Sequence, residues 1–104
     1  MDKYNIEITE PAENDLTEIG YYIKHDLLEP EIALKTIEKI SNKILELEYM
    51  PFRNEIVKDE RLSIQGIRKF IIDNYIVFYS VSENMKMVTI IRVLYGKRNW
   101  IDLL

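Results

Sequence analysis

The chain has 104 residues, a formal net charge of −4, no cysteine and one histidine. These counts exclude disulfides, thiol catalysis and cysteine-based zinc sites, and they exclude a metal cage built from several histidines. We therefore expect residues 1–104 to form a single domain that holds no metal and no cofactor.

The two halves of the sequence differ in charge. Residues 1–52 contain five Lys/Arg and twelve Asp/Glu, whereas residues 53–104 contain nine Lys/Arg and six Asp/Glu. No apolar run approaches the roughly 18 residues of a membrane-spanning helix, and residues 1–5 do not begin a signal peptide. We expect a cytoplasmic protein with no membrane partner. The excess of positive charge in residues 53–104 should influence which partners the protein binds.

A strand and two helices are predicted first. Residues 4–8 alternate between apolar and polar, as in a half-buried strand. Apolar residues from Ala12 to Leu27 then recur every three or four positions and predict a helix over 11–28, with Thr9 as its N-cap. The same spacing from Ala33 to Leu47 predicts a second helix over 30–49, antiparallel to the first. The polar residues between the apolar positions of the first helix should face water: Glu13, Asn14, Asp15 and Glu18.

The second half of the sequence predicts strands. Residues 52–65 are mixed and charged, which indicates a loop, and β-branched or aromatic runs follow at 67–72, 75–82 and 85–95. Two-residue turns between these runs predict a three-stranded antiparallel meander. With the first strand, this gives an α+β fold: a four-stranded, largely antiparallel sheet, a two-helix hairpin on one face and a short apolar C-terminal tail.

The register of these turns decides which residues share a face. Arg68, Tyr75, Tyr79, Lys86 and Arg92 are expected on one face, and Ile67, Ile71, Ile76, Phe78, Met87, Ile91 and Val93 on the face that the helices cover. Arginines and tyrosines on an open face suit either a phosphate backbone or an acidic, amphipathic protein segment. The tail, with Trp100, packs either on this sheet or on a target protein.

The order of elements resembles a known family. The hairpin after a first strand, the segment Gly66–Arg68, the strand Tyr75–Tyr79 and the ending Ile90–Asn99 resemble the RelE/ParE toxins of bacterial type II toxin–antitoxin systems. The resemblance implies a toxin that inhibits growth in a plasmid stabilisation system. It also implies a cognate antitoxin that neutralises this toxin within a toxin–antitoxin hetero-oligomer.

The family has two mechanisms. RelE-like members are metal-independent, ribosome-dependent mRNA endoribonucleases, and for them the resemblance implies catalytic roles for Arg68, Arg92, Tyr95 and Lys97. ParE-like members poison DNA gyrase. The charges of the 52–65 loop cancel, and a net charge of −4 disfavours a ribosome ligand. The gyrase target is therefore preferred, with the nuclease as the alternative and an inactive relic or protein-binding module as a further one. The residues expected to bind antitoxin or target are Arg68, Tyr79, Arg92, Lys97, Arg98 and Trp100.

Overall fold

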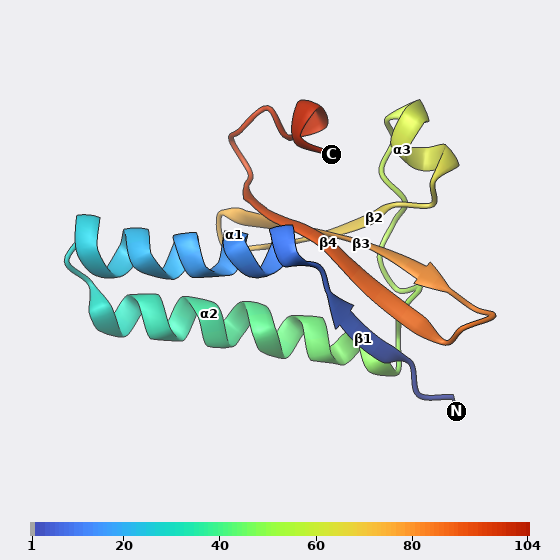
Figure 1. Ribbon diagram of the computed structural model, residues 1–104, viewed down its shortest axis with the longest axis horizontal. Helices are drawn as coiled ribbons and strands as arrows, with labels where there is room; N and C mark the ends of the chain where they lie inside the picture. The colour runs from blue at the N-terminus through green and yellow to red at the C-terminus, as the bar shows by residue number, and fades with distance from the viewer. Residues whose placement is uncertain (1) are drawn as a thin grey trace.

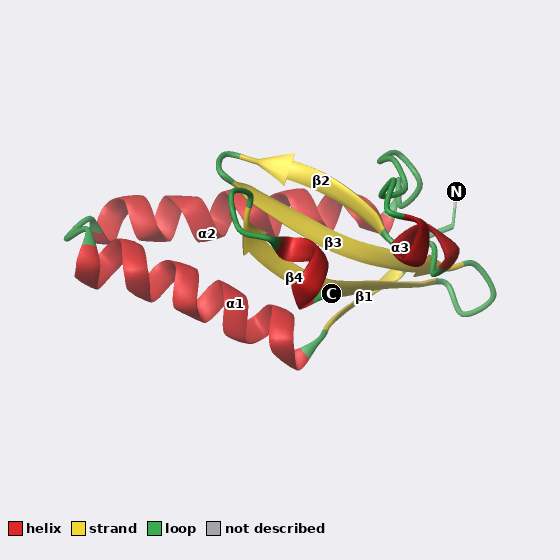
Figure 2. Cartoon of the chain, turned by 90° about the horizontal axis from the view of Figure 1, so that it is seen from above, coloured by secondary structure: helices red, strands yellow, loops and turns green. Residues whose placement is uncertain are grey.

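The computed structural model describes residues 2–104 and shows three layers. A helical hairpin lies below a four-stranded sheet, and a short helix and the C-terminal segment lie above it (Figure 1). Seen from above, the C-terminal segment and the short helix α3 lie on the near side of the strands (Figure 2). The α+β architecture predicted from the sequence is confirmed.

The hairpin consists of α1 (Glu10–Tyr21), which a π-helical turn (Tyr22–Asp26) extends, and α2 (Pro30–Leu45), which a 3₁₀ turn (Glu46–Glu48) extends. Thr9 caps α1, because its Oγ1 accepts a hydrogen bond from the Ala12 amide at 3.3 Å. The predicted helices agree with these bounds to within two residues at each end. Only Leu27, the last apolar position of the first helix, is half exposed instead of packed.

The sheet has the strand order β1-β4-β3-β2. β1 (Asn5–Ile8) pairs in parallel with β4 (Met87–Tyr95), while β2 (Arg68–Ile72), β3 (Tyr75–Ser82) and β4 form the antiparallel meander. The predicted register of the first hairpin, with Arg68 opposite Tyr79, is confirmed.

The predicted register of the second hairpin is wrong. Its loop holds four residues, 83–86, and Lys86 takes a positive φ of 50° in it, so Val81 pairs with Val88. Further along, Tyr79 pairs with Ile90 but Phe78 pairs with Arg92, which leaves Ile91 as the extra residue of a β-bulge. The bulge changes which side chains of β4 point to which face of the sheet.

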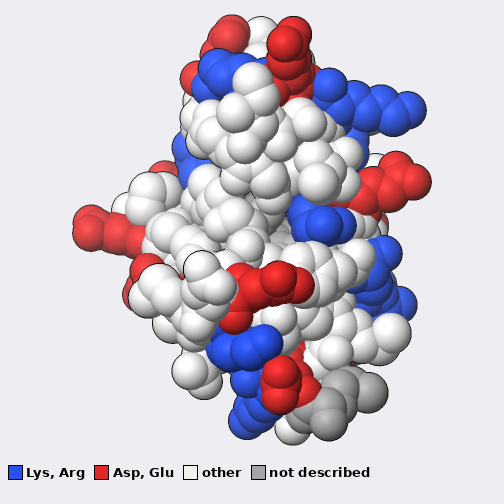
Figure 3. All heavy atoms as spheres, turned by 90° about the vertical axis from the view of Figure 1, so that its right-hand side faces the viewer, with Lys and Arg blue, Asp and Glu red and all other residues white. Residues whose placement is uncertain are grey.

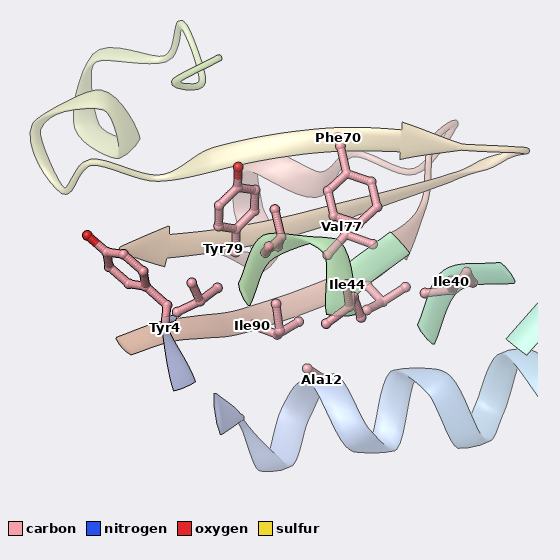
Figure 4. Close-up of a cluster of buried hydrophobic side chains, with 11 residues drawn as sticks. Tyr4, Ala12, Ile40, Ile44, Phe70, Val77, Tyr79 and Ile90 are labelled. Atoms are coloured by element: carbon pink, nitrogen blue, oxygen red, sulfur yellow. The ribbon is translucent and has the colours of Figure 1, made fainter. Parts of the chain in front are cut away.

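Independently of the bulge, the helices cover the face that the sequence predicted to be open. The main core joins sheet residues Phe70, Val77, Tyr79, Val88, Ile90 and Val93 to Tyr4 and to Ala12, Ile40, Ile44 and Leu47 beneath the sheet (Figure 4). Of the helix residues expected in the core, Ile23, Ile40 and Ile44 are buried, whereas Ile19 and Ile37 are partly buried. The helical hairpin therefore packs on the sheet as predicted, but on the face opposite to the predicted one.

A second apolar cluster fills the opposite face. Val57, Leu62, Ile67, Ile76, Phe78 and Leu94 form it, and Ile91, Trp100, Leu103 and Leu104 pack against it. The helix α3 (Glu60–Ile64) supplies Leu62, so the prediction of a continuous loop over 52–65 is wrong. Asp59 caps this helix by accepting a hydrogen bond from the Leu62 amide at 3.2 Å. None of the helices within residues 2–104 combines the length and the apolar character needed to cross a membrane.

Candidate functional site

The two arginines singled out in the sequence lie on opposite faces of the sheet. Arg68 is paired with Tyr79 and therefore shares the helix-covered face, because directly paired residues point the same way. Arg92 is paired with Phe78 and shares the face that the C-terminal segment covers. The structure therefore does not bring Arg68 and Arg92 together around one ligand.

Arg92 is bound to Asp15. Its Nε and Nη2 atoms donate to the two carboxylate oxygens at 2.7 and 2.8 Å, and Nη1 donates to the Leu103 carbonyl at 3.2 Å. The hydrogen bonds to Asp15 raise the pKa of Arg92. Three N–H donors of the guanidinium are thus used in hydrogen bonds within the protein, and these bonds connect α1, β4 and the C-terminal segment.

Asp15 is buried, although the sequence placed it in water. β1 ends at Ile8, opposite Ile90, so no strand pairs with the next part of β4 on this side. Asp15 takes the place of a strand there, because its carboxylate accepts a hydrogen bond from the Val93 amide at 3.0 Å. The Asp15 carboxylate thus accepts hydrogen bonds both from the backbone at the edge of β4 and from the Arg92 guanidinium. We interpret it as a residue that stabilises the fold.

Arg68 is held by the segment that follows α2. Its Nη1 donates to the Asn54 carbonyl at 2.6 Å, and the guanidinium lies over the Phe52 ring at 5.1 Å. Among the residues that the structure describes, no carboxylate lies within ion-pair distance of Arg68. Arg68 therefore keeps an uncompensated charge at the edge of the sheet.

Tyr79 is fully buried, so the prediction of an exposed tyrosine for base stacking or partner contact is wrong. Its hydroxyl donates to the Pro51 carbonyl at 2.9 Å and accepts from the Asn54 side-chain amide at 3.2 Å. Burial raises the pKa of Tyr79, and the hydrogen bond from Asn54 opposes that rise. This residue anchors the segment after α2 and offers no contact surface.

Three tyrosines line a groove between the hairpin and the ends of β3 and β4. Tyr22 follows Ile19 by one helical turn, and Tyr75 and Tyr95 face each other edge-on at 6.1 Å. We call this the tyrosine groove; it has a volume of about 560 Å³, and Ile19, Leu27, Glu18 and Arg98 also line it. Burial, with the neighbouring Tyr95 and Tyr22, raises the pKa of Tyr75.

The tyrosine groove contains two of the residues predicted to be functional, Tyr95 and Arg98, while Lys97 is exposed in the turn before Arg98. Tyr22 is a further residue of this groove that was not expected from the sequence. Its position three residues after Ile19 was the available signal, because i and i+3 lie on one face of a helix.

The tail packs on the protein's own sheet. Trp100 belongs to a 3₁₀ helix (Trp100–Leu103), its ring lies 5.0 Å from that of Phe78, and the Lys69 amine lies over it at 5.3 Å. Arg61 fastens the same segment by donating to the Ile101 carbonyl at 2.8 Å. Of the two expected positions for the tail, the structure therefore shows the one on the sheet.

The group beside Arg92 that could move a proton is the Asp15 carboxylate, whose two oxygens accept hydrogen bonds from the guanidinium. The single histidine, His25, stacks on Tyr21 at 4.1 Å, near the outer end of the hairpin. Lysines and arginines are mixed with acidic residues on the end of the molecule seen in Figure 3, with no continuous basic area there. Within residues 2–104, no cluster of three or more His, Asp or Glu side chains is placed to hold a metal ion.

Comparison with protein families gives one match. Residues 6–100 match the family model described as the ParE toxin of the type II toxin–antitoxin system parDE. The comparison with curated proteins gives no significant match.

Solved structures with the same fold come from two kinds of toxin–antitoxin system. The chromosomal ParDE system of P. aeruginosa gives a TM-score of 0.72 at 21% identity, covering 91% of this chain and 98% of the other. The RelBE2 toxin–antitoxin complex of Mycobacterium tuberculosis gives 0.65 at 20% identity, covering 91% and 93%. The intact E. coli RelBE complex gives 0.64 at 17% identity, covering 91% and 99%.

Proposed function

Because the chain belongs to the ParE toxin family of type II toxin–antitoxin systems, we propose that it arrests bacterial growth by binding DNA gyrase and that it does not cleave RNA. The observation that carries this proposal is the closed pair of Arg92 and Asp15 on the face opposite Arg68. An RNA-cleaving site needs cations that converge on one phosphate and groups that move protons beside it. Here Asp15 neutralises the charge of Arg92, and Arg68 lies on the opposite face of the sheet.

The other two residues expected in a nuclease site, Tyr95 and Lys97, do not complete a site around Arg68 or Arg92. Tyr95 lies in the tyrosine groove, on the helix-covered face with Val93 and Tyr75. Lys97 is exposed in the turn after β4.

We also propose a cognate antitoxin as the partner that neutralises this toxin in the cytoplasm. Two of the structures with the same fold, RelBE2 of Mycobacterium tuberculosis and RelBE of E. coli, are toxin–antitoxin complexes. The basic half of the sequence and the uncompensated charge of Arg68 favour an acidic, amphipathic segment that covers the sheet edge and the tail with Lys97, Arg98 and Trp100. Arg92 and Tyr79 contribute to this surface only by holding it in place.

The test separates the two targets in one strain. Regulated expression of the chain should stop growth, and co-expression of the antitoxin from the neighbouring reading frame should restore it. The purified chain should inhibit supercoiling by gyrase or trap cleaved DNA, while primer extension on cellular mRNA shows no codon-positioned cuts. Such cuts in the wild type, lost in Arg68→Ala, would refute the gyrase proposal in favour of the nuclease.

A further inference from the structure

We propose that the outer end of the helical hairpin, formed by Tyr22, Leu27 and Leu28, is the surface that docks on gyrase, and that it binds a positively charged part of that enzyme. We call these three residues the hairpin tip. The inference rests on the proposed function and specifies where the contact lies. It assigns the target to the acidic half of the sequence and leaves the basic half to the antitoxin.

The hairpin tip exposes apolar surface with no cover in this protein. Tyr22, Leu27 and Leu28 are 51%, 50% and 79% exposed. Tyr22 and Leu27 also line the tyrosine groove, so the apolar surface continues from the tip to the end of the sheet. A contiguous apolar area of this kind, next to a groove, is typical of a protein interaction site.

The backbone at the hairpin tip departs from regular geometry in order to present these side chains. Tyr22–Asp26 is π-helical, a form that is rare and frequent at functional sites. Leu28 then adopts a φ of 56°, a left-handed conformation that suits glycine or asparagine and disfavours leucine. A leucine that is both strained and almost fully exposed contributes little to folding, which indicates a role in binding.

The charges around the hairpin tip indicate the charge of the partner surface that it would bind. Glu18 lines the groove, Asp26 and Glu29 flank the two leucines, and Glu31 lies in the first turn of α2. Lys24 and Lys35 are the basic residues between positions 18 and 35, and Arg98 also lines the groove, so the four carboxylates outnumber the three cations there. An apolar centre with an acidic rim complements a positive surface, and an enzyme that holds DNA presents one.

The position of the hairpin tip allows it to act apart from the rest of the surface. In Figure 1 the tip projects to the left of the sheet, away from α3 and from the C-terminal segment that carries Trp100. Of the residues proposed for antitoxin binding, Arg68 and Trp100 lie on the sheet edge and that segment, whereas Arg98 lines the tyrosine groove together with Tyr22 and Leu27. Leu28 lies outside the lining of the groove, so substitutions at the tip change the proposed gyrase surface without removing a residue proposed for antitoxin binding.

The experiment compares two double variants with matched exposure. Leu27→Ser/Leu28→Asn changes the tip, and asparagine tolerates the left-handed conformation at position 28. Leu45→Ser/Ile64→Ser changes two side chains that are 52% and 80% exposed and lie elsewhere. Each purified chain is tested for its melting temperature, for its affinity for purified gyrase by surface-based binding, and for growth arrest on expression.

We expect the tip variant to keep its melting temperature, to bind gyrase about tenfold or more weakly and to lose growth arrest, while the control matches the wild type. If the tip variant fails to fold, Asp26→Lys replaces it, and reversal of one rim charge should slow association and weaken binding by several-fold. Equal gyrase binding by the tip variant and the wild type would overturn this inference alone. A wild type that arrests growth without binding gyrase would overturn the proposed function and this inference with it.

Discussion

The pair of Asp15 and Arg92 gives a sharp test of whether Arg92 is structural or catalytic. Arg92→Gln removes the cation and leaves a buried carboxylate with only the Val93 amide as a partner. Breaking a buried pair in this way costs about 3–5 kcal/mol. The side chain of Arg92 is 21% exposed, so solvent already screens part of the interaction and we expect about 3 kcal/mol.

The double variant Asp15→Asn/Arg92→Gln should recover most of that loss. It replaces the two charges by neutral amides, it avoids the cost of burying the carboxylate, and the amide oxygen introduced at position 15 can still accept from the Val93 amide. We expect the double variant to be less stable than the wild type by about 1 kcal/mol. The single variant should therefore melt well below the wild type, at about 4–8 °C per kcal/mol for a chain of this size, and the double variant close to it.

Growth arrest measured in parallel decides the role of Arg92. If Arg92 holds the fold, toxicity should fall in the single variant and return in the double variant as stability returns. Urea unfolding of the purified chains gives the free energies of unfolding, and regulated expression gives toxicity. A double variant that is folded and stable but harmless would refute this reasoning, because it would mean that the guanidinium itself is needed.

Four other expectations concern stability. Ile40→Ala, at a position with no exposure, should lower the free energy of unfolding by about 2–5 kcal/mol in urea titrations. Because burial raises the pKa of Tyr79 above its unfolded value of 10.0, the folded state holds this proton more tightly. Stability should be lost as the pH rises above about 10, less so in Tyr79→Phe. Deletion of residues 99–104 uncovers Phe78 and should lower the melting temperature, while the hairpin core keeps the chain folded by circular dichroism. Leu28→Gly should raise stability by about 0.5–1 kcal/mol, measured by thermal unfolding, since glycine accepts the positive φ that leucine resists.

The order of elements could be predicted because each one has a clear local period. Apolar residues at helical spacing indicated both helices, and β-branched runs indicated the strands. The register of the first hairpin followed from its two-residue turn, Asp73-Asn74, in which Asp73 takes a positive φ of 52°.

The seat of the helices could not be predicted, because both faces of the sheet are apolar. Phe70 and Val77 meet the helices, while Ile76 and Phe78 meet the tail, and the two sets are equally suited to a core. The bulge at Ile91 has no local sequence signal either, since it depends on how β4 fits both β1 and β3. The alternation of the strand alone then assigns the following residues to the wrong face.

The candidate site was only partly predictable for the same reason. Arg68 and Arg92 were recognised as cations on strands, but their partners come from distant segments. The partner of Arg92 is Asp15, a helix residue that amphipathic spacing predicts to face water. Asp15 is buried because β1 ends at Ile8 and leaves the Val93 amide of β4 without a strand partner, and the Asp15 carboxylate accepts a hydrogen bond from that amide. The helix α3 was missed although Asp59 is a good N-cap, because its five residues carry too short a period to detect.

The parallel pairing of β1 with β4 has a consequence for synthesis of the chain. Asn5 pairs with Met87, and Thr9 bonds the carbonyls of Ile90 and Ile91. The first strand and the helical hairpin leave the ribosome long before the strand that joins them to the sheet. Until then the apolar side of the hairpin has no cover, so the nascent chain is open to capture by another protein. A partner made from the same message and already present could bind at that moment, before the fold is complete.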